Sequence, residues 1–246
     1  MKAQKTAVVT GASGGIGRQI AFTLSQNGFR VAAVYHDNRK SAENLLEQIR
    51  SANGSAQIYR CDLANSSEVS RLQETVIEDF SGVDVLINNA GIASQKLITD
   101  VSDDEFDRMM DVNFKSVFLM TKAFLPHFIH KKQGKIINIS SIWGLTGASC
   151  EVVYSASKAA VIGFSKALAK EVGPSGIQVN CIAPGVIETP MLDHLSDADK
   201  QELAEETPLQ RLGSPIDVAN TVLFLAGNAG EFFTGQVLSP NGGIVI

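Results

Sequence analysis

The sequence predicts an α/β protein of the doubly wound class, in which one parallel sheet is covered by helices on both faces. Short apolar segments alternate with amphipathic segments of helical period along the whole chain. A glycine-rich turn joins the first apolar segment to the first amphipathic one. Polar motifs recur where the predicted strands end, and open α/β sheets bind their ligands at the carboxyl ends of their strands.

Composition sets the limits of this prediction. The chain has 246 residues, of which 44% are hydrophobic, so we expect a single domain over residues 1–246. The net charge of −5, without a basic run, indicates neither a nucleic-acid partner nor an anionic membrane partner. No apolar run reaches the ~18 residues of a membrane span, and the start of the chain lacks a signal-peptide hydrophobic region. Three unclustered cysteines (Cys61, Cys150 and Cys181) predict neither a disulfide framework nor a metal site and fit a cytoplasmic protein.

The elements follow from periodicity and from turn and capping residues. The expected strands are residues 6–10, 30–35, 56–60, 83–87, 135–139, 177–183 and 235–239. A helix with Ile16, Ile20 and Leu24 on one face follows the first strand and closes at Asn27-Gly28.

Capping residues and breakers place the other helices. A helix is expected at 41–52, and Asn65 with Glu68 opens one that runs to Phe80. Ser102 with Glu105 opens a long helix that carries Asn113. Further helices are expected at 153–172, at 197–206 and from Pro215.

The main chemical motif lies at residues 140–158. Tyr154 and Lys158 are four residues apart, so they share one face of the 153–172 helix. A free phenol has a pKa of about 10, and a neighbouring ammonium is expected to lower it toward the working range. Ser141, from the preceding loop, is placed to hold a substrate oxygen near the phenol. The group suits proton transfer to or from a carbonyl or alcohol oxygen, although the pair alone also fits an ordinary exposed helix face.

The first turn reads G-x-x-x-G-x-G, from Gly11 through Gly15 to Gly17. Glycines allow positive φ and let backbone N–H groups approach a pyrophosphate, whose charge a helix N-terminus favours. The spacing differs from G-x-G-x-x-G, and taken alone it also fits any tight strand-to-helix turn.

With these motifs in place, the chain resembles the short-chain dehydrogenase/reductase family over nearly its full length. The motifs that carry the resemblance are Thr10-Gly11-x-x-x-Gly15-Ile16-Gly17, Asn88-Asn89-Ala90-Gly91, Asn113, Ser141 with Tyr154-x-x-x-Lys158, and Pro184-Gly185-x-Ile187-x-Thr189. Within the family the chain is most similar to bacterial β-ketoacyl-acyl carrier protein reductases and acetoacetyl-CoA reductases. The resemblance implies a Rossmann-type sheet of strand order 3-2-1-4-5-6-7, an NADPH cofactor and a homotetramer.

The resemblance also implies the catalytic roles. Ser141 would bond the substrate carbonyl, and Tyr154 would transfer the proton. Lys158 would bind the nicotinamide ribose and lower the tyrosine pKa. Asn113 would hold a relay water, although a polar helix residue that bonds its own backbone is the alternative. No metal is implied.

The implied cofactor-binding residues lie at the ends of successive strands. They are Gly11, Ser13, Gly15, Ile16, Gly17, Tyr35, His36, Arg39, Asp62, Leu63, Asn89, Ala90, Gly91, Tyr154, Lys158, Pro184, Gly185, Ile187 and Thr189. Among them, Asp62 would accept a bond from the adenine amino group or serve only as a turn residue. Asn89 would lie along the ribose, and Thr189 would bind a phosphate.

Cofactor choice rests on the end of the second strand. NAD-preferring relatives have an acid there, whereas this chain has Tyr35 followed by His36 and Arg39, which favours NADPH over NAD. Gly14, where many NADP enzymes carry arginine, and the nearby Asp37 weaken this inference.

The predicted reaction is reduction of a β-keto acyl thioester or a similar ketone. An alcohol or sugar/polyol dehydrogenase is the alternative enzyme, and a dinucleotide-binding sensor or scaffold is the alternative without catalysis. We expect a substrate lid at about 187–212 and an apolar C-terminal segment that serves oligomerisation.

Dependence on an acyl carrier protein is expected to be weak. The resemblance implies that an acidic carrier docks on two basic residues near the mouth of the active site. Lys132 occupies one of these positions, but Ser175 replaces the arginine at the other.

Overall fold

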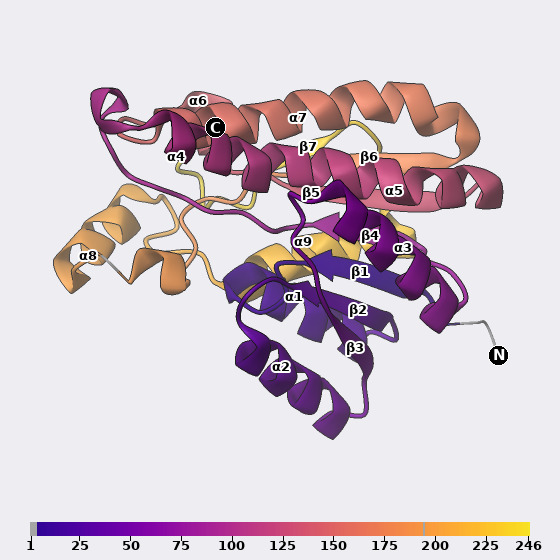
Figure 1. Cartoon of the computed structure of the whole chain (residues 1–246). Coiled ribbons are helices and arrows are strands. Elements are labelled where there is room, and N and C mark those ends of the chain that lie inside the picture. The colour runs from indigo at the N-terminus through magenta and orange to yellow at the C-terminus, as the bar shows by residue number, and fades with distance from the viewer. Residues whose placement is uncertain (1–3, 194) are drawn as a thin grey trace.

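The computed structural model, which describes residues 4–193 and 195–246, is built on a seven-stranded parallel sheet. The strand order is β3-β2-β1-β4-β5-β6-β7, as predicted (Figure 1). The strands are β1 (Thr6–Thr10), β2 (Arg30–Tyr35), β3 (Ser55–Arg60), β4 (Val85–Asn88), β5 (Gly134–Ile139), β6 (Ile177–Ile182) and β7 (Val237–Leu238). The expected α/β doubly wound class is thereby confirmed.

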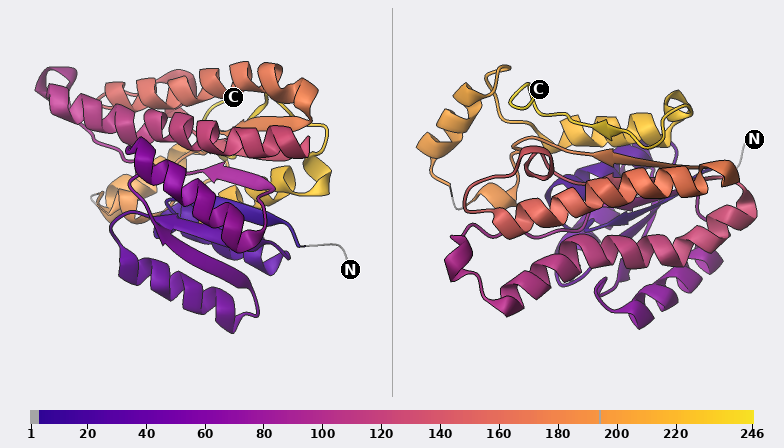
Figure 2. Two further views of the ribbon diagram at one scale, coloured as in Figure 1. Left: turned by 45° about the vertical axis from the view of Figure 1, so that its right-hand side comes forward. Right: turned by 90° about the horizontal axis from the view of Figure 1, so that it is seen from above.

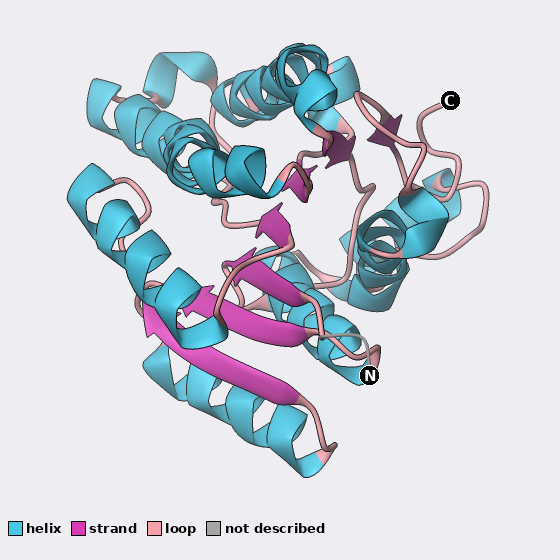
Figure 3. Cartoon of the chain, turned by 90° about the vertical axis from the view of Figure 1, so that its right-hand side faces the viewer, coloured by secondary structure: helices cyan, strands magenta, loops and turns pink. Residues whose placement is uncertain are grey.

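Helices cover both faces of this sheet, and in end view the strands form one twisted row between them (Figure 3). One apolar core is built on α1 (Gly15–Gln26), α2 (Arg39–Ser51) and α9 (Pro215–Ala226). The other is built on α3 (Ser66–Phe80), α5 (Ser116–Lys131) and α7 (Val152–Val172).

Successive side chains of a strand point to opposite faces of the sheet and so contribute to both cores. In β1, Val9 belongs to the first core and Val8 to the second, and both are fully buried. A strand buried on both faces reads as a continuous apolar run, which is why the period-2 pattern is missing from this part of the sequence.

The remaining helices are short and lie mostly beyond the carboxyl ends of the strands. They are η1 (Ile98–Asp100), α4 (Asp103–Met110), η2 (Asp111–Lys115), α6 (Trp143–Thr146), η3 (Gly173–Ser175), η4 (Pro190–Leu192), α8 (Asp197–Glu206) and η5 (Asn228–Gly230). The capping boxes at Ser102/Glu105 and Ser214/Asp217 open α4 and α9. Asn65 caps α3 through the N–H groups of Ser67 and Glu68.

Two expected elements differ from those observed. The helix that carries Asn113 is not one regular helix, because α4 and α5 are joined by η2, a π-helical turn that inserts a residue into the ladder. The last strand is only two residues long, since the N–H of Gln236 bonds the side chain of Asn180 on β6 rather than a backbone carbonyl of that strand. No helix within the described ranges is long and apolar enough to cross a bilayer.

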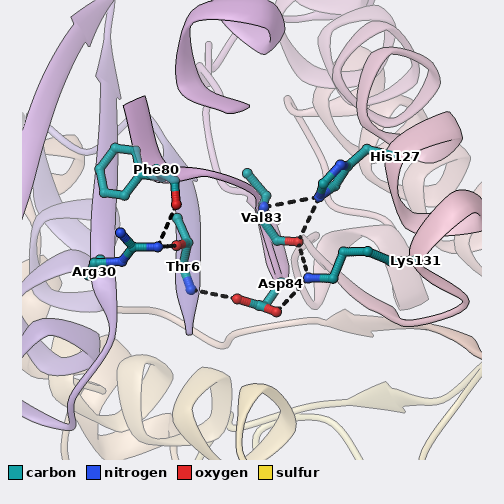
Figure 4. Close-up of polar contacts among 7 residues, drawn as sticks. All are labelled: Thr6, Arg30, Phe80, Val83, Asp84, His127 and Lys131. Carbon is teal, nitrogen blue, oxygen red and sulfur yellow. Dashed lines mark hydrogen bonds and ion pairs between the residues drawn. The ribbon is translucent and has the colours of Figure 1, made fainter. Parts of the chain in front are cut away.

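A polar cluster fastens the amino edge of the sheet (Figure 4). The Asp84 carboxylate accepts hydrogen bonds from the Thr6 N–H at 2.7 Å and from the Lys131 Nζ at 2.7 Å, which connects β1 to α5. Beside it, the Val83 N–H donates to His127 Nε2 at 3.1 Å. The Val83 carbonyl oxygen lies 3.2 Å from the same Nε2, so the tautomer of the ring decides which of these two groups it bonds. Burial lowers the pKa of His127 from its ordinary value, and the hydrogen bond with Val83 opposes this only in part.

We therefore predict that His127 makes stability depend on pH. Its folded-state pKa lies below its unfolded value, so the unfolded chain binds the proton first and the stabilisation is lost as pH falls from about 6.5 through the folded pKa. His127→Gln keeps an acceptor without titrating. Urea unfolding at pH 7.5 and pH 5.5 should show a smaller acid loss in His127→Gln than in the unsubstituted protein.

The matched control is His130→Gln, since the His130 side chain is exposed on the same helix. An equal reduction of the acid loss in both variants would contradict this role of His127.

Candidate active site

Two adjoining cavities open at the carboxyl edge of the sheet, at the end of the molecule where α4, α6 and α8 lie (Figure 2). The first, which we call the glycine-turn cavity, has a volume of about 750 Å³ and runs from the β1–α1 turn to Tyr154 and Lys158. The second, the lid cavity, has a volume of about 680 Å³ and lies between Ser141, Tyr154 and α8. Tyr154 lines both, so it stands where the two spaces meet.

The structure brings Ser141, Tyr154 and Lys158 together. Lys158 Nζ lies 5.7 Å from the centroid of the Tyr154 ring and donates a hydrogen bond to the Ile139 carbonyl at 3.1 Å. The Ser141 Oγ accepts a hydrogen bond from the Trp143 N–H at 3.2 Å, and the serine also hydrogen-bonds Tyr154. The phenol thus has a hydroxyl partner on one side and an ammonium within reach on the other.

Burial dominates the electrostatics of this group. It raises the pKa of Tyr154 to about 12, and the hydrogen bond with Ser141 opposes the rise only in part. Burial also lowers the pKa of Lys158 to about 8. Lys158 bonds a carbonyl rather than the phenol, and its expected lowering of the tyrosine pKa stays a prediction. At neutral pH Tyr154 is therefore a protonated donor.

Short side chains fix the first turns of α7. The Ser140 hydroxyl donates to the Lys158 carbonyl at 2.8 Å, and the Ser157 hydroxyl donates to the Tyr154 carbonyl at 2.7 Å. Gly144 packs so closely on the same backbone that a Cβ there would meet the Lys158 carbonyl carbon at 2.8 Å. These contacts set the depth at which the tyrosine and lysine stand.

Asn113 is buried in the π-helical turn next to this group. Its Oδ1 accepts a hydrogen bond from the Ile92 N–H at 2.8 Å, and its Nδ2 donates to the Ile92 carbonyl at 2.9 Å and to Ser157 Oγ at 3.0 Å. The alternative that this asparagine bonds its own helix backbone is wrong. Asn113 instead connects the loop after β4 to α7.

The glycine turn fits a dinucleotide pyrophosphate. Gly11 and Gly15 have φ values of +64° and +40°, which only glycine adopts without strain. The α1 N-cap is Gly14, and no side chain of the described residues caps this helix end, so its first N–H groups are available to an anion.

The end of the glycine-turn cavity beyond β2 and β3 is lined by Tyr35, His36, Asp62 and Leu63. The Asp62 carboxylate accepts the Ala64 N–H at 3.0 Å, so it does form the strand-end turn, and Asp62 also lines the cavity.

Two other predicted cofactor residues are engaged elsewhere. Arg39 pairs with Glu43 at 2.8 Å and is not among the described lining residues. Asn89 donates to the Thr10 carbonyl at 3.0 Å and so holds β4 against β1.

The other predicted residues divide between the cavities. Those lining the glycine-turn cavity are Gly11, Ser13, Gly15, Ile16, Asn89, Ala90, Gly91, Lys158 and Thr189. Those lining the lid cavity are Ile16, Ser141, Pro184, Gly185, Ile187 and Thr189. Gly17 lies behind the turn, where it lets α1 approach Gly11.

Part of the lid-cavity wall was not predicted from the sequence. Gln95 and Trp143 line it without belonging to a motif or to the expected lid, whereas α8 falls within the expected lid at 187–212. The segment over the cavity is tied down where it leaves and rejoins the fold, because Gly213 donates to the Val186 carbonyl at 2.9 Å and accepts the Glu188 N–H at 2.8 Å.

The expected carrier-docking position is wrong for a single chain. Lys132 precedes β5 and Ser175 precedes β6, so both lie at the amino edge of the sheet. Ser141, the predicted catalytic serine, follows β5, and the six residues of that strand separate the two edges by roughly 20 Å. Residues at opposite ends of one strand cannot flank the same opening.

Comparison with known proteins agrees with this arrangement. A family model described as short chain dehydrogenase matches residues 5–200. The chain is 40% identical over 240 residues to an uncharacterized oxidoreductase, YmfI, of Bacillus subtilis, covering 97% of this chain and 98% of the relative. It is 39% identical over 244 residues to the 3-oxoacyl-[acyl-carrier-protein] reductase FabG of Staphylococcus aureus, covering 99% of each. It is 38% identical over 242 residues to nodulation protein G of a Rhizobium species, covering 98% and 97%.

The geometry of the turn predicts that alanine substitution has different effects at two of its glycines, Gly17 and Gly14. A Cβ at Gly17 would meet the Gly11 carbonyl oxygen at 2.3 Å and Asn89 Nδ2 at 2.4 Å, whereas a Cβ at Gly14 would meet nothing within 4 Å. We expect Gly17→Ala to lower the free energy of unfolding by about 1–3 kcal/mol and to weaken dinucleotide binding. Gly14→Ala should be tolerated in the same urea-unfolding and dinucleotide-titration measurements. Equal behaviour of the two variants would contradict the close approach at Gly17.

Proposed function

This chain belongs to the short chain dehydrogenase family, and we propose that within this family of oxidoreductases it is an NADPH-dependent ketoreductase. Its substrate is a β-keto acyl thioester or a related activated ketone, which it reduces to the hydroxy compound. The observation that supports this function most directly is the protonated Tyr154 phenol, which Ser141 hydrogen-bonds beside the buried Lys158 at the junction of the two cavities.

Each side chain has a defined task in this reaction. Ser141 donates its hydroxyl to the substrate carbonyl and holds it beside the phenol. Tyr154 gives its proton to that oxygen as negative charge develops there. Lys158, charged below a pKa of about 8, stabilises the phenolate that remains. Asn113 fixes the loop after β4 against α7 and holds a water through which the site is reprotonated.

The bound nicotinamide dinucleotide supplies the hydride that reaches the carbonyl carbon. The residues present fit such a cofactor. The glycine turn and the uncapped start of α1 receive the pyrophosphate, with Thr189 across from Gly15, where a Cβ would meet its methyl group at 3.2 Å. Among the residues that line the two cavities, Asp62 and Leu63 would contact the adenine, Asn89 to Gly91 the ribose, and Pro184 to Ile187 the nicotinamide.

The raised pKa of Tyr154 supports reduction over alcohol oxidation. A phenol that stays protonated at neutral pH can donate a proton, whereas oxidation of an alcohol needs the phenolate as base. The relatives named as reductases of acyl-carrier-bound substrates support a β-keto acyl group. Ser175, which replaces the second of the two basic residues expected to dock an acidic carrier, supports only weak dependence on a carrier protein.

We propose that one domain, residues 1–246, contains the whole catalytic apparatus and that residues 187–212 act as a lid. The two ends of this segment are tied together at Val186, Glu188 and Gly213, so the piece between them can move while its attachments stay fixed.

The catalytic proposal is tested by removing one oxygen atom. Tyr154→Phe should keep the fold and cofactor binding but lose roughly 10²–10⁴-fold in turnover, because the general acid is gone. The assay is steady-state kinetics with NADPH over a panel of acyl-CoA, acyl-carrier and free ketone substrates. Tyr59→Phe is the matched control, since the Tyr59 hydroxyl bonds Asp79 on the surface. A Tyr154→Phe variant with full activity would contradict the role of Tyr154 as the proton donor.

Cofactor preference is predicted to favour NADPH, measured as kcat/KM against NADH. Tyr35 and His36 line the cavity, and Asp37, which accepts a bond from His36 at 2.8 Å, is the nearby carboxylate that repels a 2′-phosphate. Asp37→Asn should therefore raise the NADPH preference by about threefold. Glu47→Gln removes the same charge from the exposed side of α2 and should change nothing. A tenfold preference for NADH would reverse the prediction.

We also propose a homotetramer. The apolar side chains of Phe232 and Ile246, near the C-terminus, are fully exposed in the single chain. Exposed aromatic and aliphatic groups of this kind favour an interface with another copy. Light scattering at micromolar concentration should give four times the chain mass, and a monomer mass would refute the oligomer.

A further inference from the structure

The helix of the proposed lid, α8, is held over the lid cavity by little packing of its own. It stands apart from the rest of the fold at one end of the molecule (Figure 1), and none of its ten residues is buried. The residue that follows it, Thr207, is only 4% exposed, and its hydroxyl donates to the Leu203 carbonyl at 2.9 Å. The position of α8 therefore depends on how its exit, residues 207–209, is anchored to the fold.

A turn near the C-terminus, which we call the C-terminal turn and define as residues 239–243, anchors this exit. The Leu209 N–H donates to the Gly242 carbonyl at 3.1 Å. Gly242 has a φ of +66°, and a Cβ added to it would lie 2.5 Å from Thr207 Cγ2. Only a residue without a side chain lets the turn approach the exit of α8 this closely.

The same turn is bonded to another wall of the lid cavity. The Ser239 hydroxyl donates to the Ala183 carbonyl at 2.7 Å, and the Gly185 N–H donates to the Pro240 carbonyl at 3.1 Å. Gly185 itself lines the lid cavity. A small cavity of about 220 Å³ lies between Gly185, the turn and the exit of α8, so the exit has room to shift when the turn changes. The C-terminal turn thus connects two walls of the lid cavity that are far apart in the sequence.

We propose that the C-terminal turn is a positioning element, which sets where α8 stands over the lid cavity and so sets the affinity for the ketone. This inference rests on the proposed ketoreductase function and adds an element outside the catalytic group. Leu203 and Glu206, in the last turn of α8, line the lid cavity directly before the anchored exit. A displaced exit therefore moves a wall of the substrate space, while Tyr154 on α7 keeps its place. Ketone binding should change and proton transfer should not.

Gly242→Ala tests the anchor, with acetoacetyl-CoA as the ketone and NADPH as the cofactor. The added Cβ must displace Thr207, so KM for acetoacetyl-CoA should rise by on the order of tenfold. Because the reacting groups are untouched, kcat and the dissociation constant of NADPH should stay unchanged. In the substrate-free protein, amide hydrogen exchange of α8 should become faster, which is a readout that needs no turnover.

Two further variants separate this contact from backbone strain. Gly235→Ala is the matched control, since Gly235 has a similar φ of +70° but its Cβ would meet the Ala169 side chain at 3.5 Å, an ordinary contact distance. Its KM and its exchange of α8 should equal those of the unsubstituted protein. Adding Thr207→Ser to Gly242→Ala removes the obstructing methyl group and keeps the hydroxyl that bonds Leu203, so both readouts should recover.

The outcomes separate the two claims. Unchanged KM and exchange in Gly242→Ala, an equal rise of KM in Gly235→Ala, or no recovery with Thr207→Ser each overturn the positioning role and leave the ketoreductase intact. If Gly242→Ala does not fold, Ser239→Ala, which loses the bond to Ala183, should still raise KM by about threefold, and an unchanged KM overturns the role. If the unsubstituted protein reduces no ketone, the proposed function fails and the link to ketone affinity fails with it, whereas hydrogen exchange still decides whether the turn holds α8.

Discussion

The buried ammonium of Lys158 is the constraint around which the site is built. Its side chain is 4% exposed, and a buried charge is costly unless polar groups surround it. The structure offers the Ile139 carbonyl at 3.1 Å, directly at the end of β5. Gly91 packs closely on the same group, because a Cβ there would lie 3.1 Å from Lys158 Nζ and 3.3 Å from Asn113 Oδ1. The Asn-Ala-Gly turn after β4 is thus shaped by the lysine as much as by any ligand.

The same constraint explains why so many short polar side chains are buried beneath α7. Asn88, on β4, donates to Asn138 Oδ1 on β5 at 2.8 Å, and Asn138 donates to Ser165 Oγ on α7 at 2.8 Å. These bonds hold the helix to the sheet along its length, while Ser140 and Ser157 fix its first turns. Buried polar networks of this kind specify one arrangement of the packed elements, which a purely apolar interface would leave free to slide.

The sequence predicted the parts of the molecule that local rules determine. Alternating apolar segments, capping residues and glycine turns depend only on neighbours in the chain, so they could be read from the sequence. The positions of the motifs after the strands predicted the edge of the sheet that holds Tyr154 and Lys158, and the family resemblance implied the strand order. Long-range effects were beyond such reasoning. The pKa of Tyr154, for example, depends on how deeply α7 is buried. The π-helical turn at Asn113 has no sequence signature in this chain, because its extra residue is stabilised by bonds to Ile92 and Ser157, far along the sequence.

The two edges of the sheet use ionisable groups in opposite ways. At the amino edge, Asp84 pairs with Lys131 and with the Thr6 N–H, so its charge is neutralised inside the fold and contributes to fastening β1 and β4 to α5. At the carboxyl edge, Lys158 has carbonyl and aromatic neighbours but no carboxylate bonded to it among the described residues. A carboxylate paired with this ammonium would neutralise most of its electrostatic potential. Because Lys158 bonds a neutral carbonyl, its positive charge remains able to stabilise the negative charge that a departing proton leaves on Tyr154. The ionisable groups therefore stabilise the fold at the amino edge and serve the proposed reaction at the carboxyl edge.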